Sequence, residues 1–155
     1  MEEGIEIARE LMTGLLERIG VRTEIKGSLK EGDIYLEIQG DREGILIGKH
    51  GRTLESLQFL ISRMVNKRLK ESVRIVLDID DYRKRRAETL GKMALRLGER
   101  AKRLGHALTT GPFNAHDRRI VHITLQEDPG LRTESLGEGP LKKISIIPKV
   151  NEGRE

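Results

Sequence analysis

The first half of the chain alternates between helical and strand-like spacing of its hydrophobic residues. Over residues 3–19 the apolar side chains recur every three or four positions, which predicts a helix that Gly20 ends. Apolar and polar residues then alternate over residues 21–25 and again over 34–38, which predicts two strands. Glycines at the intervening positions 27–32 predict a hairpin loop between them. The chain therefore opens as a helix followed by a β-hairpin.

Two further amphipathic segments flank a short turn in the next part of the chain. Residues 42–47 precede the turn, and apolar residues at helical spacing follow it over 53–65. A third strand is predicted over residues 73–79, where the apolar side chains alternate again. The predicted order is helix, strand, strand, helix, turn, helix, strand.

The turn has the sequence Ile47-Gly48-Lys49-His50-Gly51-Arg52. Two glycines three positions apart let the backbone bend sharply and approach another molecule closely, because neither carries a Cβ. We expect the amides at the start of the following helix to face outward as donors for a phosphate, with Lys49 and Arg52 adding positive charge. A Walker A phosphate loop is excluded, since it would need Gly at the position of Glu43 and Ser or Thr at that of His50.

Residues 81–104 are predicted to form one long helix with a seam of small residues beside its apolar positions. The seam consists of Ala87, Gly91, Ala94, Gly98, Ala101 and Gly105. Glycine inside a helix costs about 1 kcal/mol relative to alanine, so another element is expected to approach closely there. We expect the domain's own sheet, with a partner helix as the alternative. The outward positions make this helix the strongest cationic surface of the chain, namely Arg83, Lys84, Arg85, Arg86, Lys92, Arg96, Arg100, Lys102 and Arg103.

A second helix with phosphate-binding potential follows a short predicted strand around residues 107–109. Asn114 is a good N-cap, with Asp117 three positions later. Arg118 and His122 stand four positions apart on one face of this helix, with Arg119 beside them. A guanidinium and an imidazole placed in this way can both reach one phosphate, the arginine in a bidentate manner.

Charge is distributed unevenly along the chain, whose net charge is +4. Residues 1–45 hold 6 basic and 11 acidic side chains, whereas residues 82–122 hold 11 basic and 3 acidic ones. A localised basic surface attracts polyanions, so nucleic acid is a natural partner. The chain has no Cys, no long apolar run and an acidic start, which together predict a cytoplasmic protein without membrane insertion.

Catalytic and metal chemistry has little support in the sequence. Asp78, Asp80 and Asp81 could form a magnesium-binding cluster, but we expect Asp80 or Asp81 to cap the following helix instead. None of the four histidines pairs with another at zinc-ligand spacing on a helix, and no nucleophile motif is present. We therefore expect no catalytic residues, no metal and no cofactor.

Two family resemblances unite these features. The order of elements in the first 80 residues, with its Gly-x-x-Gly turn, resembles the type II KH domain. The run Asn114-Ala115-His116-Asp117-Arg118-Arg119-Ile120-Val121-His122 resembles the signature helix of the R-three-H (Arg-x-x-x-His) domain, and residues 133–140 and 142–148 resemble its tail. A KH domain followed by an R-three-H domain closely resembles the bacterial Jag-type RNA-binding proteins. Members of that family usually carry a further N-terminal domain, and this sequence begins at the predicted KH helix.

The resemblance implies an α+β protein with a type II KH domain (1–80), an R-three-H domain with a three-stranded sheet (81–150) and a tail (151–155). It implies binding of single-stranded RNA, or unpaired segments of structured RNA, with single-stranded DNA as an alternative. The implied binding residues are Ile47, Gly48, Lys49, His50, Gly51, Arg52, Arg118, Arg119 and His122. It further suggests post-transcriptional control linked to bacterial growth, division and cell shape, and a small KH-only protein partner. The alternatives are a docking adaptor that uses the small-residue seam and a metal-dependent nuclease that uses the carboxylates at 78–81.

Overall fold

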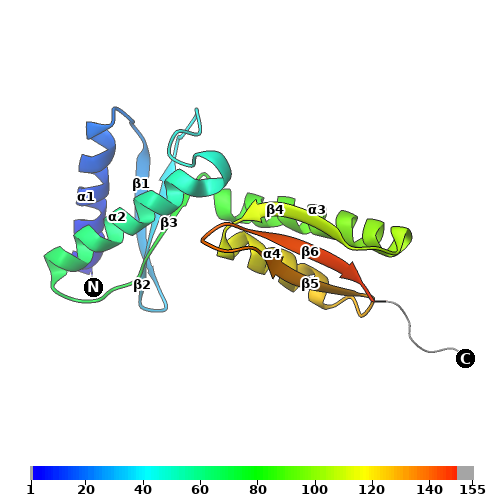
Figure 1. Ribbon diagram of the computed structural model, residues 1–155. Coiled ribbons are helices and arrows are strands. Elements are labelled where there is room, and N and C mark those ends of the chain that lie inside the picture. Colours follow the sequence, from blue (N-terminus) through cyan, green and yellow to red (C-terminus); the bar gives the residue numbers. More distant parts are fainter. Residues whose placement is uncertain (1, 150–155) are drawn as a thin grey trace, which may run out of the picture. The chain divides into compact units, whose positions relative to one another are not determined.

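The computed structural model describes residues 2–149, which form two compact units (Figure 1). The first unit ends at Arg83 and the second begins at Lys84. The described residues contain four α-helices and two three-stranded sheets, so the predicted α+β class is confirmed. Within residues 2–149, no helix combines the length and the apolar character needed to cross a bilayer.

The first unit packs two helices against one sheet. Its elements are α1 (Glu2–Arg18), β1 (Glu24–Lys30), β2 (Asp33–Gln39), the 3₁₀ helix η1 (Lys49–Gly51), α2 (Arg52–Leu69) and β3 (Ile75–Ile79). The strand order is β1-β2-β3, with β1 antiparallel and β3 parallel to the central β2. Met12 of α1, Leu36 of β2 and Ile61 of α2 meet in the fully buried core.

The hairpin loop is shorter than the sequence predicts. Gly27 and Ser28 lie inside β1, and only Glu31 and Gly32 form the loop. Both loop residues have positive φ, as a two-residue type I′ turn requires. Gly27 has a different role, since a Cβ there would lie 2.5 Å from Cγ2 of Ile5. The glycine therefore lets α1 pack closely on the strand and does not break it.

The helix predicted over residues 42–47 is not formed. The structure has consecutive turns there, with Gly44 at a φ of 67°. The side chain of Asp41 accepts the amides of Leu46 and Ile47, which a helix would have bonded to backbone carbonyls. The amphipathic spacing reflects burial of Leu46, with Ile47 partly buried, in a compact loop.

The second unit contains all but the first two residues of α3 (Tyr82–Leu104), together with β4 (Leu108–Phe113), α4 (Ala115–Gln126), β5 (Leu131–Leu136) and β6 (Lys142–Pro148). Its sheet has the order β4-β6-β5, and both pairs are antiparallel. Leu90 of α3, Val121 of α4 and Ile146 of β6 belong to one buried cluster, separate from the core of the first unit. The predicted three-stranded sheet of this unit is confirmed.

The small-residue seam of α3 packs against its own unit, as expected. A Cβ on Gly98 would lie 2.7 Å from Cδ1 of Leu131 in β5 and 3.1 Å from Cδ2 of Leu125 in α4. A Cβ on Gly91 would meet only Oγ1 of Thr124, at the ordinary contact distance of 3.8 Å. Close approach is therefore concentrated at Gly98.

These two glycines give a matched stability test. We expect Gly91→Ala to stabilise the protein by up to about 1 kcal/mol, because alanine favours helix and finds room. Gly98→Ala gains the same propensity but overpacks against Leu131 and Leu125, which costs about 1–3 kcal/mol. Urea unfolding of the two variants should therefore show Gly98→Ala to be clearly the less stable. Equal stabilities would contradict the close approach.

Candidate nucleic-acid interface

The Gly-x-x-Gly turn has a backbone conformation that requires both of its glycines. Gly48 has φ 70° and ψ −176°, a region that is essentially restricted to glycine. A Cβ there would lie 2.2 Å from Oγ1 of Thr53. Gly51 is left-handed at φ 78°, and a Cβ on it would lie 2.7 Å from Cε1 of Tyr82. The turn can therefore form only where neither position carries a side chain.

The backbone amides that remain available for a phosphate are not those at the start of α2, where the sequence predicts them. The amide of Arg52 donates to the Lys49 carbonyl, and those of Thr53 and Leu54 both donate to the carbonyl of Ile47. The start of α2 therefore uses its amides internally, which corrects the expectation that they face outward. Among the described residues, the amides of Lys49 and His50 have no recorded acceptor. These two amides, at the tip of the turn, are the backbone donors that remain for an anion.

Three cationic or titratable side chains surround these amides. Lys49, His50 and Arg52 are all exposed, whereas Ile47 is partly buried against the core of the first unit. His50 is a non-glycine residue in the left-handed region, with φ 55° and ψ 29°. Strained conformations of this kind are typical of ligand clamps and switches. The turn thus presents charge and free donors on a fixed backbone.

Asp80 and Asp41 support the base of the turn by accepting backbone amides. The sequence suggested Asp80 as a helix cap or metal ligand and gave Asp41 no role. Asp80, directly after β3, accepts the amides of Gly40 and Asp41, one with each oxygen and both at 3.0 Å. Asp41 is only 8% exposed, and its Oδ2 accepts the amides of Leu46 at 3.0 Å and Ile47 at 3.2 Å. The carbonyl of Ile47 in turn accepts the amides of Thr53 and Leu54 in α2. A chain of hydrogen bonds therefore connects the end of β3 to the base of the turn.

A third aspartate, Asp78, accepts an amide at the start of α3. Oδ1 of Asp78 accepts the amide of Arg83 at 3.3 Å, so Asp78 provides a cap where the sequence suggested Asp80 or Asp81. Arg83 is also held in place by its side chain, which donates to the carbonyl of Leu77 and to Oε1 of Gln58. Within residues 2–149, no group of three or more acidic, histidine or cysteine side chains could hold a metal ion. The carboxylates of 78 and 80 are instead used as acceptors of backbone amides.

The helix α4 is fixed by its N-cap and by a buried ion pair. Oδ1 of Asn114 accepts the amide of Asp117 at 2.8 Å, which confirms the predicted cap. The carboxylate of Asp117 also accepts from Nη2 of Arg86 at 2.9 Å, and both side chains are largely buried. Breaking this ion pair would leave a buried charge without a partner. The pair therefore holds α4 in one orientation against α3.

The three residues predicted to bind on α4 have different environments. Nη1 of Arg118 donates to the carbonyls of Phe113 at 2.7 Å and Pro140 at 3.4 Å, so half-buried Arg118 links the end of β4 to the loop before β6. Nδ1 of His122 lies 2.6 Å from Oγ1 of Thr133 in β5, and the imidazole is exposed. When the Thr133 hydroxyl donates to Nδ1, the proton sits on Nε2, which is then a donor. Arg119 is exposed and has no recorded partner in the described part of the chain.

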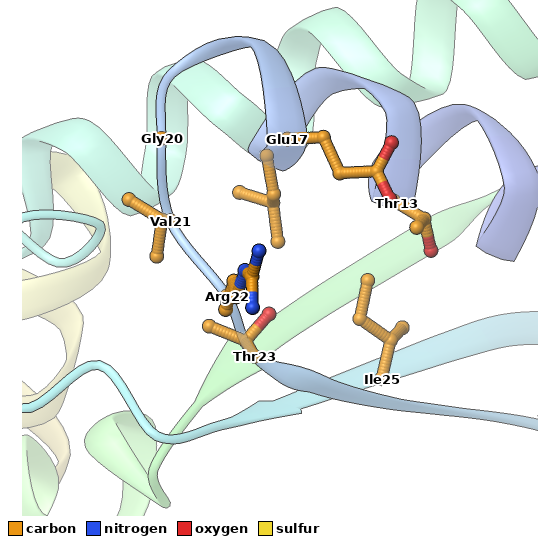
Figure 2. Close-up of a pocket in the computed structure, with 8 residues that line it drawn as sticks. Thr13, Glu17, Gly20, Val21, Arg22, Thr23 and Ile25 are labelled. Atoms are coloured by element: carbon orange, nitrogen blue, oxygen red, sulfur yellow. The ribbon is translucent and has the colours of Figure 1, made fainter.

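A hollow at the end of α1 lies in a different part of the first unit from the Gly-x-x-Gly turn. Figure 2 shows its lining side chains, which come from the last turns of α1 and the segment that leads into β1. It encloses about 690 Å³ and contains the oppositely charged Glu17 and Arg22. Oγ1 of Thr23 is buried there without a recorded hydrogen-bond partner among the described residues. None of the predicted binding residues lines it.

Comparison with known proteins agrees with the two units. Residues 5–77 match the family model of the KhpA/KhpB KH domain, and residues 88–148 match that of the R-three-H domain. RNA-binding protein KhpB of Clostridium symbiosum is 36% identical over 154 residues, which cover 99% of this chain and 68% of the relative. KhpB of Bacillus subtilis is 26% identical over 147 residues, covering 94% of this chain and 71% of the relative.

KhpB of Lactiplantibacillus plantarum is 28% identical over 145 residues, and these cover 94% of this chain but only 45% of the relative. The chain therefore spans between about half and seven-tenths of the length of these relatives. The resemblance to Jag-type proteins is confirmed by both domain matches, which occur in the predicted order. The chain belongs to the bacterial KhpB family, in which a KH domain precedes an R-three-H domain.

Proposed function

We propose that this chain binds single-stranded RNA, or unpaired segments of structured RNA, through the Gly-x-x-Gly turn and through α4. The observation that carries the proposal is the turn itself. Its two glycines adopt conformations that exclude side chains, and its tip presents two amides without recorded acceptors beside Lys49 and His50. The relatives' name, RNA-binding protein KhpB, supports the choice of RNA as the ligand.

The turn grips the phosphodiester backbone. The amides of Lys49 and His50 bond phosphate oxygens, and the side chains of Lys49, His50 and Arg52 neutralise the charge. A KH turn of this type clamps about four nucleotides, so the contact is short and depends on the backbone being correctly placed in advance. The brace formed by Asp80 and Asp41 supplies that placement.

A second stretch of the strand binds on α4. Nε2 of His122 and the guanidinium of Arg119 are the exposed donors there, while Arg118 holds the end of β4 to the loop before β6. This division of roles refines the expectation that Arg118 and His122 share one phosphate. The 2′-hydroxyl is the group by which RNA would be distinguished from single-stranded DNA, so a matched pair of RNA and DNA oligonucleotides separates the two ligands.

The cellular setting is proposed from family resemblance alone. It comprises a cytoplasmic location and post-transcriptional control linked to growth, division and cell shape. Crosslinking followed by sequencing of the bound RNA tests this setting, and recovery of no reproducible transcripts would contradict it.

A second candidate function, docking of a small KH-only protein, has one structural observation in its favour. Phe59, Leu60 and Met64 of α2 are apolar yet 65%, 48% and 37% exposed. Phe59→Asp with Leu60→Asp should abolish co-purification with such a partner after nuclease treatment, and RNA affinity should stay unchanged. Retained co-purification would contradict docking on α2. The small-residue seam cannot serve as the docking surface, since Leu125 and Leu131 cover it at Gly98.

The principal test replaces Lys49 and His50 with Asp. Affinity for a single-stranded RNA of about 20 nucleotides, several times the length one KH turn spans, should fall at least about tenfold. The fold should survive, because both side chains are exposed and Asp tolerates the left-handed backbone of position 50.

The matched control is Lys26→Asp with Lys30→Asp on β1, which changes the net charge by at least as much. Those lysines lie beside Glu24 and Glu37 and should leave affinity nearly unchanged. An equal loss in both variants would mean that net charge, and not the turn, governs binding. An unchanged affinity of the turn variant, with an intact circular dichroism spectrum, would contradict the proposed site.

The hydrogen bonds of Asp41 and Asp80 at the base of the turn lead to a separate prediction. Asp41→Ala should lower the free energy of unfolding by about 2 kcal/mol, because it leaves two largely buried amides without an acceptor. It should also weaken RNA binding, since the base of the turn loses its support. Asp41→Asn keeps an acceptor oxygen and should recover part of both losses. Asp33→Asn, in an exposed pair with Arg74, is the control and should change neither quantity. Normal RNA affinity of a folded Asp41→Ala protein would show that the brace does not position the turn.

A further inference from the structure

The helix α3 carries nine basic and two acidic side chains, far more charge than the proposed function uses. The structure divides these cations into two groups. Arg83 is bonded to Leu77 and Gln58, and Arg86 is buried against Asp117. Lys102 lies 2.7 Å from Asp128 and 2.8 Å from Glu99, and the hydrogen bond to Asp128 is the main cause that holds its pKa above the ordinary value. These three cations bond to other groups of the protein and so stabilise the fold.

Four cations of the second group form one row, which we call the basic stripe. The stripe consists of Lys92, Arg96, Arg100 and Arg103. All four are exposed, and within residues 2–149 none of them lies within 4 Å of a carboxylate. Spacings of four, four and three residues place them on one face of a helix. The opposite face holds Leu90, Ala94, Gly98 and Ala101, which are buried.

The geometry of the stripe suits a phosphodiester backbone. The eleven steps from Lys92 to Arg103, each with a rise of 1.5 Å, give it a length of about 16 Å. At the 3.4 Å spacing of one strand of a stacked helix, that length corresponds to about five phosphates. Cations without carboxylate partners lose no ion pair on binding, and each phosphate that they neutralise releases a condensed counterion.

An anionic membrane fits the stripe less well. A helix that binds a bilayer surface buries a wide apolar face in the lipid and keeps its charged face toward water. The apolar face of α3 is already buried against the sheet and α4 of its own unit. Apart from Leu95 and Leu104, the exposed surface of α3 is mainly charged, and RNA supplies a regular row of opposite charge.

We propose that the basic stripe of α3 is a further RNA-binding surface, distinct from the turn and from the residues of α4, which contacts phosphates without reading bases. The inference rests on the proposed function, since it assumes that the chain binds RNA. The stripe adds affinity in proportion to the number of phosphates it reaches, and it makes binding more sensitive to salt. It imposes no base preference, because its cations contact phosphates, which every RNA sequence shares.

The test measures the salt dependence of binding for Arg96→Gln with Arg100→Gln. On single strands, log K falls with log salt at about 0.7 per phosphate neutralised, so the slope should become shallower by about 0.7 to 1.4. The probe is an oligouridylate of about 20 nucleotides, titrated between about 50 and 200 mM salt. Affinity at low salt should fall several-fold, and Arg96→Lys with Arg100→Lys should restore the slope because it keeps both charges.

The control is Arg9→Gln with Lys26→Gln, which removes two cations that lie beside Glu6 and Glu24. It should leave the slope unchanged. Identical slopes in the stripe variant, the control and the wild type would overturn the inference while leaving the proposed function in place. Absence of any RNA binding by the wild-type chain would overturn both. A stripe variant that loses binding to an acidic protein but keeps its RNA slope would also overturn the inference.

Discussion

Four backbone amides bonded to two aspartate carboxylates hold the functional end of the first unit together. Asp80 accepts the amides of residues 40 and 41, and Asp41 accepts those of 46 and 47. Hydrogen bonds to charged groups contribute about 1.5–3 kcal/mol each, more than ordinary ones. They allow an irregular loop to replace a helix without leaving buried amides unpaired. The turn that follows can then adopt strained backbone conformations at Gly48 and His50, because its base cannot relax.

The parts of the fold that were predictable follow from periodic burial. Three sequence patterns each reflect packing of one face against a neighbouring element. They are the apolar face of α1, the alternation in β2 and β3, and the small-residue seam of α3. The Gly-x-x-Gly turn could be located because both glycines are required by positive φ and by lack of space. Asn114 could be recognised as a cap because Asp117 follows at the necessary spacing.

The sequence predictions were wrong where an aspartate side chain, and not a backbone carbonyl, accepts the amides of a segment. They were also wrong where close packing, and not the usual preference of glycine for loops, decides the local structure. Asp41 takes the amides of Leu46 and Ile47, so an amphipathic segment becomes a loop. Gly27 looks like a loop residue, but it lies in β1 because Ile5 packs over it. Sequence spacing could place Arg118 and His122 on one face of α4. It could not show that Arg118 bonds two carbonyls or that Thr133 orients the imidazole, since these contacts come from segments distant in the chain.

The charged side chains have different roles in the two units. In the first, exposed cations gather at one strained turn. In the second, some cations of α3 and α4 hold the core elements together, and others remain unpaired on the surface. We propose that the turn and α4 bind separate stretches of one RNA strand.

A double-mutant cycle on the full chain tests that claim most directly. It combines Lys49→Asp and His50→Asp with Arg119→Ala and His122→Ala, with binding measured on a long single-stranded RNA. Sites that bind independently should give losses that add within about 0.5 kcal/mol. On an RNA of about four nucleotides, the length one KH turn spans, the α4 substitutions should have no effect on turn-bound RNA. Unchanged long-RNA affinity after the α4 substitutions alone would contradict the account, since the turn would then be the only site of the two that binds.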